Sequence, residues 1–203
     1  MIDRQRHVQE LMAYDAAFRQ GGMIIAGMDE AGRGPLAGNV VAACVVMPED
    51  PAILWIDDSK KLSESRRETV FDEIMTHALY VGVGEVSPAE IDQINILEAT
   101  RKAMRIAAAQ VPADLFLIDA VKGLGLKGRE TPIIRGDALS YAIAAASIVA
   151  KVTRDREMIR LDREYPGYGF ARNKGYGTKE HIDALKRIGP CPLHRNSFIG
   201  HFV

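Results

Sequence analysis

Hydrophobic residues gather in continuous runs along this chain, and three of these runs predict buried strands. They cover residues 23–26 (MIIA), 39–47 (NVVAACVVM) and 115–120 (LFLIDA). Two further strand patterns cover residues 79–86 and 131–134. Because apolar runs of this length are typical of strands inside a domain, the pattern predicts a central sheet.

Helical spacing of apolar residues fills the segments between and after these strands. The predicted helices cover residues 3–19, 63–76, a short stretch opened by 87–90, 96–110, 141–165 and 178–188. Ser63, Ser87 and Thr178 are the expected N-caps. The first half of the longest helix, 141–165, is apolar or small on nearly every side, which indicates burial against the sheet. The order of elements predicts an α/β fold, with a mixed central sheet flanked by helices and a C-terminal helical segment.

The length of 203 residues suits one domain. We expect an N-terminal accessory helix within residues 1–22, a core over 23–165, and a C-terminal loop, helix and tail over 166–203 that pack on the core. No apolar stretch approaches the length of a membrane span, and the charged N-terminus does not resemble a secretion signal. Two cysteines, Cys44 and Cys191, make neither a disulfide framework nor a four-ligand zinc site, so a cytoplasmic location is expected.

Charge is unevenly distributed along the chain, although the net value is only −1. Residues 1–150 carry −6 and residues 151–203 carry +5. The basic C-terminal quarter suits a polyanion partner, but scattered solvated charge would give the same count.

Within that quarter, residues 166–177 (PGYGFARNKGYG) interleave three aromatic residues with Arg172 and Lys174 on a glycine-rich backbone. Aromatic faces beside cations are typical of nucleic-acid grooves. Lys60 and Lys61 form another basic pair, which is equally typical of a solvated loop.

The most informative stretch is residues 23–38 (MIIAGMDEAGRGPLAG). A strand pattern ends there in two adjacent carboxylates, Asp29 and Glu30, and the turn Gly32–Gly34 follows. Two carboxylates at the mouth of a buried strand are costly unless a metal ion or an arginine lies on them. Glycine lets a ligand approach the backbone closely, and the guanidinium of Arg33 suits phosphate.

Four carboxylates share one local context in the predicted fold. Asp29, Glu30 and Asp119 stand at strand ends, and Asp137 comes just before the long helix. Strand ends on one edge of an α/β sheet gather into one crevice, so this acidic cluster predicts a site for Mg²⁺ or Mn²⁺. Because adjacent residues of a strand face opposite ways, Asp29 and Glu30 reach one site only if the strand frays into the loop there.

Two other motifs indicate chemistry only weakly. Residues 123–128 fit G-x-G-x-x-G after a strand, but another strand pattern follows, so a glycine hairpin loop is a better interpretation than a dinucleotide site. Ser140 or Ser147 with His181 or His194 lacks the spacing of a nucleophile elbow, and Ser140 is more simply a helix cap.

Taken together, these motifs resemble those of ribonuclease HII, the type 2 ribonuclease H family. Matching blocks run from Ile24 to about Phe198, and they are GMDEAGRGPLAG, DSKKLSESRRE, EIDQINILEAT, LFLID, GDALSYAIAAASIVAKVTRDREM, YPGYGFARNKGYGTKEH and HRNSF. The resemblance implies a ribonuclease H-like fold, cleavage of RNA strands paired to DNA, and incision at single ribonucleotides embedded in duplex DNA.

The resemblance also implies roles for individual residues. The metal-binding, catalytic carboxylates would be Asp29, Glu30, Asp119 and Asp137. Gly32, Arg33 and Gly34 would read the ribose 2′-hydroxyl and the adjacent phosphate, and Tyr176 would contact that hydroxyl and stack on the next sugar. The other expected substrate-binding residues are Lys60, Lys61, Arg172 and Lys174. Two positions depart from the family pattern without removing a functional group: Ala120 stands where glycine is common, and Gly177 where some relatives have proline.

The implied mechanism is two-metal phosphodiester hydrolysis with Mn²⁺ or Mg²⁺, in which one ion activates a water and the other stabilises the leaving 3′ oxygen. The products would carry 5′-phosphate and 3′-hydroxyl ends. The implied partners are RNA–DNA hybrids and ribonucleotide-containing duplex DNA, bound by a monomer with no membrane involved.

Two alternatives stay open at this point. One is a nucleic-acid binding module without catalysis, and the other is a different nuclease or a transposase-like member of the same fold. Four carboxylates argue against the first because they would repel phosphate. The Gly32–Gly34 and Tyr176 elements argue against the second.

Overall fold

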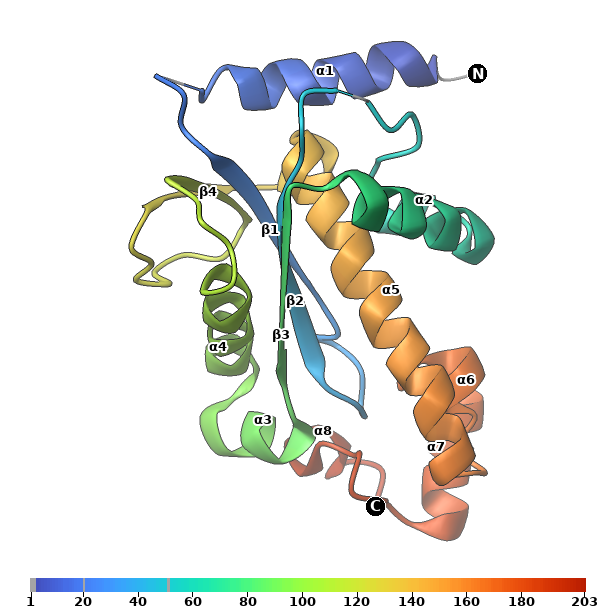
Figure 1. Ribbon diagram of the computed structural model, residues 1–203. Coiled ribbons are helices and arrows are strands. Elements are labelled where there is room, and N and C mark those ends of the chain that lie inside the picture. The colour runs from blue at the N-terminus through green and yellow to red at the C-terminus, as the bar shows by residue number, and fades with distance from the viewer. Residues whose placement is uncertain (1–2, 20, 51) are drawn as a thin grey trace.

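Five strands form one mixed sheet in the spatial order β3–β2–β1–β4–β5 (Figure 1). The structure is a computed structural model that describes residues 3–19, 21–50 and 52–203; residues 1, 2 and 20 of the predicted N-terminal segment lie outside the described residues. The strands are β1 (Ile25–Ala31), β2 (Val40–Val46), β3 (Tyr80–Val86), β4 (Leu115–Asp119) and β5 (Arg129–Ile133). β2 pairs antiparallel with β1 and β3, whereas β4 pairs parallel with β1 and β5. The predicted mixed sheet is confirmed.

Helices occupy much of the described chain outside the sheet. They are α1 (Arg4–Ala16), α2 (Glu64–His77), α3 (Pro88–Ile94), α4 (Ile96–Ala108), α5 (Tyr141–Glu164), α6 (Phe170–Asn173), α7 (Lys179–Ile188) and α8 (Asn196–Ile199). Ser63, Ser87 and Thr178 accept backbone N–H bonds at the starts of α2, α3 and α7, as predicted. None of the described helices combines the length and the apolar character needed to cross a membrane.

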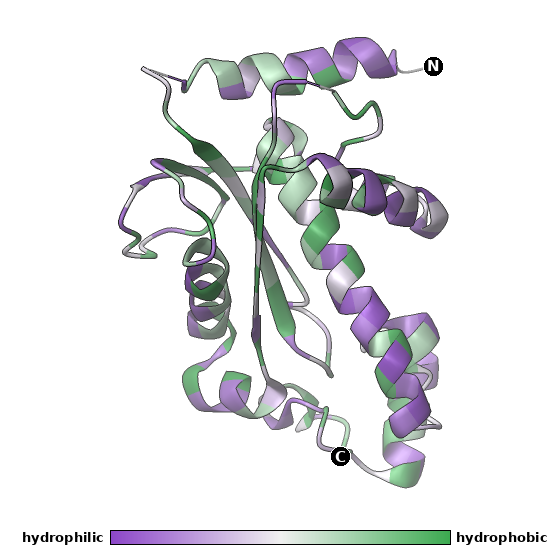
Figure 2. Ribbon diagram, in the orientation of Figure 1, coloured by the Kyte–Doolittle hydropathy of each residue, from purple (hydrophilic) through white to green (hydrophobic). Residues whose placement is uncertain are grey.

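The sheet is covered by helices on both faces. α5 packs against β1 and β2 on one face, and α4 packs against β2 and β3 on the other (Figure 1). Along β2, Ala43 and Val45 join the core beneath α5, while Ala42 and Cys44 join the core beneath α4. Both sides of this strand are therefore inside the protein, which explains why its sequence is apolar at every position. In Figure 2, the hydrophilic residues of α5, in purple, are concentrated in its second half.

The helices approach the sheet closely because glycines face them. A Cβ atom on Gly27 of β1 would lie 2.0 Å from the carbonyl carbon of Ala142 in α5. A Cβ atom on Gly84 of β3 would lie 2.1 Å from the carbonyl oxygen of Ala103 in α4. Both distances are far shorter than van der Waals contact, so only glycine allows this packing. The contact at Gly27 fixes α5 relative to β1, and residues of both elements line one pocket.

Helix α1 crosses the N-terminal end of α5 (Figure 1). Val8 and Leu11 are buried in the core that α1 shares with α5. The Asp15 carboxylate accepts a 2.8 Å hydrogen bond from the backbone N–H of Ala142, and burial raises its pKa to about 6. The first helix is therefore bonded directly to the start of α5.

Three local predictions are wrong, each for a geometrical reason. β1 does not fray at Asp29 and Glu30, because both residues pair with β2 within the strand. Residues 123–128 do not form a hairpin loop, because β4 and β5 are parallel and the chain must return to the start of the sheet between them. Residues 166–177 are not wholly a loop, because α6 forms within them.

Candidate active site

Carboxylates from three separate segments meet at one edge of the sheet. Asp29 and Glu30 lie on β1, Asp119 ends β4, and Asp137 lies in a 3₁₀ turn (Gly136–Ala138) that leads into α5. One carboxylate oxygen from each of Asp29, Asp119 and Asp137 lies within 4.8 Å of the other two. The backbone N–H of Gly136 donates a 2.7 Å hydrogen bond to Asp119 Oδ1, which ties the 3₁₀ turn to β4.

Burial and mutual repulsion make this cluster unfavourable for negative charge. Asp29 is only 4% exposed, and burial together with the neighbouring charges of Glu30 and Asp119 raises its pKa well above the ordinary value. Burial also raises the pKa values of Glu30 and Asp119. Lys60 offsets part of this charge, with its Nζ 3.5 Å from Asp137 Oδ2. Burial opposes the charge on Lys60, but the nearby carboxylates hold its pKa above the ordinary value.

Glu30 stands apart from the group of three because neighbouring strand residues face opposite ways. Its Oε1 lies 3.4 Å from NH1 of Arg33. Its Oε2 is buried and has no hydrogen-bond partner among the described residues. An orphaned buried carboxylate oxygen needs a partner, and a cation would supply one. The longer side chain lets Glu30 line the same pocket as Asp29 without fraying of the strand.

Two fully buried arginines, Arg154 and Arg195, donate hydrogen bonds to the backbone carbonyls of residues 32–39, which include the turn after β1. The guanidinium of Arg195 donates to the carbonyl oxygens of Gly32 (2.6 Å), Arg33 (3.0 Å), Pro35 (2.9 Å) and Gly38 (2.7 and 3.0 Å). Arg154 of α5 donates to those of Ala37 (2.9 Å), Asn39 (3.0 Å) and Lys174 (2.8 Å). Sequence reasoning assigned neither arginine a role, because no pattern separates a buried arginine from an exposed one.

The two glycines of this turn are required for different reasons. Gly32 has φ +94°, and a Cβ atom on it would lie 2.2 Å from Nε of Arg154. The packing and the backbone therefore both demand glycine at this position. A Cβ atom on Gly34 would meet no atom within 4 Å, although Gly34 lines the pocket. The space at Gly34 is thus open to a ligand.

One pocket of about 220 Å³ lies beside the acidic cluster and the Gly32–Gly34 turn, although Asp137, Arg154 and Arg195 do not line it. It is lined by Asp29, Glu30, Ala31, Gly32, Arg33, Gly34, Ser59, Lys60, Asp119, Ser147, Lys151 and Tyr176. Ser147 and Lys151 were not predicted as site residues. They stand four residues apart on α5 and therefore share one face of that helix. That spacing, in a helix that begins beside Asp137, is the signal that could have found them.

Three predicted substrate-binding residues do not line this pocket. Lys61 Nζ lies 2.9 Å from Asp57 Oδ1, Arg172 pairs with Glu180, and Lys174 Nζ lies 3.2 Å from Glu64 Oε1. Each is thus paired with a carboxylate of this chain.

The aromatic residues of the 166–177 segment also differ from one another. Tyr168 and Phe170 are buried and stack with ring centroids 5.2 Å apart, whereas Tyr176 is 43% exposed. Of these three aromatic residues, Tyr176 alone presents its ring to the pocket.

A sequence profile described as Ribonuclease HII matches residues 26–201. The chain belongs to the ribonuclease HII family. It is a ribonuclease H-type hydrolase, of a family that cleaves RNA in RNA–DNA hybrids. It is 50% identical to the ribonuclease HII of Acetivibrio thermocellus over 200 residues, 98% of this chain and 78% of that protein. It is 57% identical to the ribonuclease HII of Lachnoclostridium phytofermentans over 177 residues, 86% of this chain and 70% of that protein.

Solved structures of ribonuclease HII relatives share the fold. The ribonuclease H2 of Pyrococcus horikoshii has a TM-score of 0.73 and 27% identity, with 86% of this chain and 93% of that chain covered. The RNase HII of Archaeoglobus fulgidus, solved as a complex with PCNA, has a TM-score of 0.73 and 27% identity over 85% and 94% of the two chains. The predicted ribonuclease H-like fold is confirmed.

Ribonucleases H depend on divalent metal, and the donor groups of this chain fit such an ion. Three carboxylate oxygens converge within 4.8 Å, and the buried Oε2 of Glu30 has no protein partner among the described residues. Carboxylate oxygens are the ligands that hard divalent cations prefer. The charge of one cation would also offset the repulsion that raises the pKa of Asp29.

Proposed function

We propose that this ribonuclease HII hydrolyses the RNA strand of RNA–DNA hybrids and also incises duplex DNA at single embedded ribonucleotides. The products would carry 5′-phosphate and 3′-hydroxyl ends. The supporting observation is that one pocket joins the acidic cluster, the Gly32–Gly34 turn and Tyr176. A site with these parts can hold a phosphodiester beside a group that senses the sugar.

Asp29, Glu30, Asp119 and Asp137 would hold the divalent ions, Mn²⁺ or Mg²⁺. A bound pair of such ions supplies an activated water and charge stabilisation for the leaving 3′ oxygen. The four carboxylates themselves fix where the scissile phosphate can sit. Without a cation they would repel that phosphate, so they favour catalysis over a purely binding role.

The Gly32–Gly34 turn would read the ribose of the nucleotide being cleaved. Gly34 leaves the approach to the backbone open, and the Arg33 guanidinium can bind the adjacent phosphate. Because Arg195 holds the carbonyls of this turn, its backbone groups are fixed before substrate arrives. The 2′-hydroxyl is the chemical difference between RNA and DNA that such backbone groups can sense.

Tyr176 would complete the recognition of the RNA-to-DNA junction. Its exposed ring can stack on the following sugar, and its phenol can share the 2′-hydroxyl. Its backbone is fixed, because the Tyr176 carbonyl lies 2.9 Å from Nδ1 of His181. We propose that the protein acts on its substrate as a monomer.

We further propose a division of labour along the chain. Residues 1–22 would be an accessory helix, 23–165 the catalytic core, and 166–203 a substrate-binding segment that contributes Tyr176. Lys60 lines the pocket and would bind phosphate. Lys61, Arg172 and Lys174 would act, if at all, on parts of the duplex beyond it.

Three duplexes of one sequence test the proposed function. They are a continuous RNA–DNA hybrid, a DNA duplex with one ribonucleotide, and an all-DNA duplex, each incubated with Mn²⁺ or Mg²⁺. We expect cleavage of the first two and none of the third, with a 5′-phosphate end at each cut. Cleavage of the all-DNA duplex at a comparable rate would show a general nuclease and contradict the proposal.

A further inference from the structure

Lys151 is a second lysine that lines the pocket, besides Lys60. It lies on α5, one helical turn after Ser147, so it stands between the acidic cluster and Tyr176. Its side chain is 20% exposed and lines the pocket. Its Nζ lies 5.7 Å from the centroid of the Tyr176 ring. The ammonium group is thus placed beside the ring that we propose to stack on substrate.

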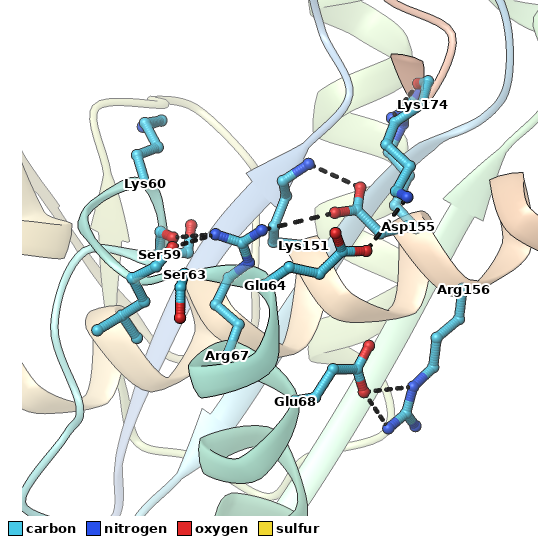
Figure 3. A network of polar contacts seen from close by, with 12 residues as sticks. Ser59, Lys60, Ser63, Glu64, Arg67, Glu68, Lys151, Asp155, Arg156 and Lys174 are labelled. Atoms are coloured by element: carbon cyan, nitrogen blue, oxygen red, sulfur yellow. Dashed lines mark hydrogen bonds and ion pairs between the residues drawn. The ribbon is translucent and has the colours of Figure 1, made fainter. Parts of the chain in front are cut away.

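The position of this ammonium group is fixed by a buried carboxylate. Lys151 Nζ donates a 2.6 Å hydrogen bond to Asp155 Oδ1, one turn further along α5 (Figure 3). Asp155 is 4% exposed, and its Oδ2 lies 4.0 Å from NH2 of Arg67. The same arginine donates to the carbonyl oxygens of Ser59 (2.8 Å) and Leu62 (2.6 Å).

This network joins two walls of the pocket. Ser59 lies in the loop that carries Lys60, and its hydroxyl accepts a 2.8 Å hydrogen bond from the hydroxyl of Ser147. Asp155 therefore connects the loop that carries Lys60, through Arg67, to Lys151 (Figure 3). Lys151 in turn lies beside Tyr176. A cation held this way loses little freedom when it binds an anion.

Lys151 keeps donors free for a ligand. An ammonium group has three N–H donors, and Asp155 is its one hydrogen-bond acceptor among the described residues. Partial burial lowers its pKa, with Asp155 opposing that effect, and an incoming anion would favour the charged form. The chemistry that matches a preorganised ammonium beside an aromatic ring is a backbone phosphate of a strand whose sugar lies on that ring.

We propose that Lys151 binds a backbone phosphate of the substrate next to the sugar on Tyr176, and that Asp155 positions it. This inference rests on the proposed function. Lys151 would then be a substrate-binding residue, contributing to affinity more than to turnover, because a non-scissile phosphate is bound alike before and during the reaction. Each such contact also adds to the number of counterions released on binding.

The test compares Lys151→Gln, Lys151→Arg and Lys102→Gln on a DNA duplex with one ribonucleotide, at saturating metal and several salt concentrations. Glutamine can still donate to Asp155 but carries no charge. Lys102 lies on α4, on the opposite face of the sheet, where it pairs with Glu90 of α3, and its substitution removes the same charge. We expect Lys151→Gln to raise KM about tenfold or more while kcat changes little. The slope of log(kcat/KM) against log[salt] should become shallower by about 0.9.

The two other variants show whether the effect belongs to this site. Lys151→Arg should restore most of the affinity and the slope, and Lys102→Gln should match the wild type. A Lys151→Gln slope equal to that of the wild type, or equal losses in Lys151→Gln and Lys151→Arg, would overturn the proposal. Absence of cleavage by the wild-type protein would instead overturn the proposed function.

Asp155→Asn tests the positioning role separately. This variant keeps the charge of Lys151 and loses the carboxylate that holds it. We expect a higher KM with the wild-type salt slope, because the phosphate contact still forms from a less ordered lysine. A KM unchanged from the wild type would remove Asp155 from the proposal.

Discussion

Asp29 is deeply buried beside two other carboxylates, so its ionised form is unfavourable in the folded protein without a cation. Asp29→Asn removes the charge and keeps the hydrogen bond that Oδ1 accepts from the Glu30 N–H (2.7 Å). In EDTA we expect the variant to be more stable than the wild type, by about 1 kcal/mol, because repulsion within the cluster is relieved. Its cleavage rate should fall about 100-fold or more because a metal ligand is lost. Thermal unfolding in EDTA and initial rates in Mn²⁺ measure both effects, and a stable variant with wild-type activity would remove Asp29 from the site.

Tyr176 is the residue on which junction selectivity would depend. We expect Tyr176→Ala to lose about tenfold more activity on a single embedded ribonucleotide than on a continuous hybrid, because stacking on the deoxyribose is lost. The loss in Tyr176→Phe should lie between that of Tyr176→Ala and none, since phenylalanine keeps the ring and loses the hydroxyl. Initial rates on the two substrates at matched metal and salt give the ratio. Equal proportional losses on both substrates would show that Tyr176 is a packing residue.

At the scale of elements, the Gly32–Gly34 turn depends on Arg195. A planar guanidinium reaches four carbonyl groups at once, and the three donors of a lysine ammonium cannot match that geometry. We expect Arg195→Lys to reduce the free energy of unfolding by about 3 kcal/mol or more. The matched control is Arg160→Lys on the exposed surface, where a change below about 0.5 kcal/mol is expected. Equal effects in denaturant titrations of both variants would contradict the role of Arg195.

Helix α7 and the segment that follows it share an acid-sensitive pair of histidines, His181 and His194. His181 Nε2 and His194 Nε2 lie 3.1 Å apart, and the backbone N–H of Cys191 donates to His194 Nδ1 (3.0 Å). Burial lowers the pKa of His194 to about 4 and also lowers that of His181. The folded state thus favours the neutral rings, while the unfolded chain takes up protons below about pH 6.5. Stability should therefore fall as the pH drops from about 6.5 towards 4.

The variant His194→Gln measures this effect. Between pH 7 and pH 5 we expect the wild type to lose about 1 kcal/mol more stability than His194→Gln. His77→Gln, at an exposed position, should follow the wild type. Parallel pH profiles of the wild type and His194→Gln would contradict the assignment.

At the scale of the whole molecule, the sequence predicted those features that depend on local patterns, such as apolar runs and helix caps. Apolar runs and caps placed most strands and helices to within a few residues, because both faces of the sheet are covered and Ser63 or Thr178 must satisfy a helix end. The predicted strand over 23–26 was too short, because β1 continues through the polar residues Asp29 and Glu30 to Ala31. Local pattern could not show that β5 runs parallel to β4, since that depends on where the chain returns. The buried arginines Arg154 and Arg195 were equally invisible.

At the site too, features marked by local sequence could be predicted, and features set by long-range packing could not. The carboxylates could be found because each lies at or near the end of a strand or precedes a long helix. The 166–177 segment was harder to interpret. Its composition suggested a nucleic-acid groove, but Tyr168 and Phe170 stack on each other in the protein interior. Ala120 adopts φ +51°, a left-handed conformation that glycine reaches more easily than alanine and that could not be known from the residue alone.

The central claim is that the acidic pocket is a metal-dependent site for cleavage beside a ribonucleotide. The most direct measurement is the initial cleavage rate of a DNA duplex with one ribonucleotide, as Mn²⁺ is added back to EDTA-treated protein. We expect no cleavage in EDTA, full recovery in the wild type, and a rate at least about 100-fold lower in Asp119→Asn at saturating Mn²⁺. Cleavage in EDTA, or a near wild-type rate for Asp119→Asn with normal folding, would contradict that claim.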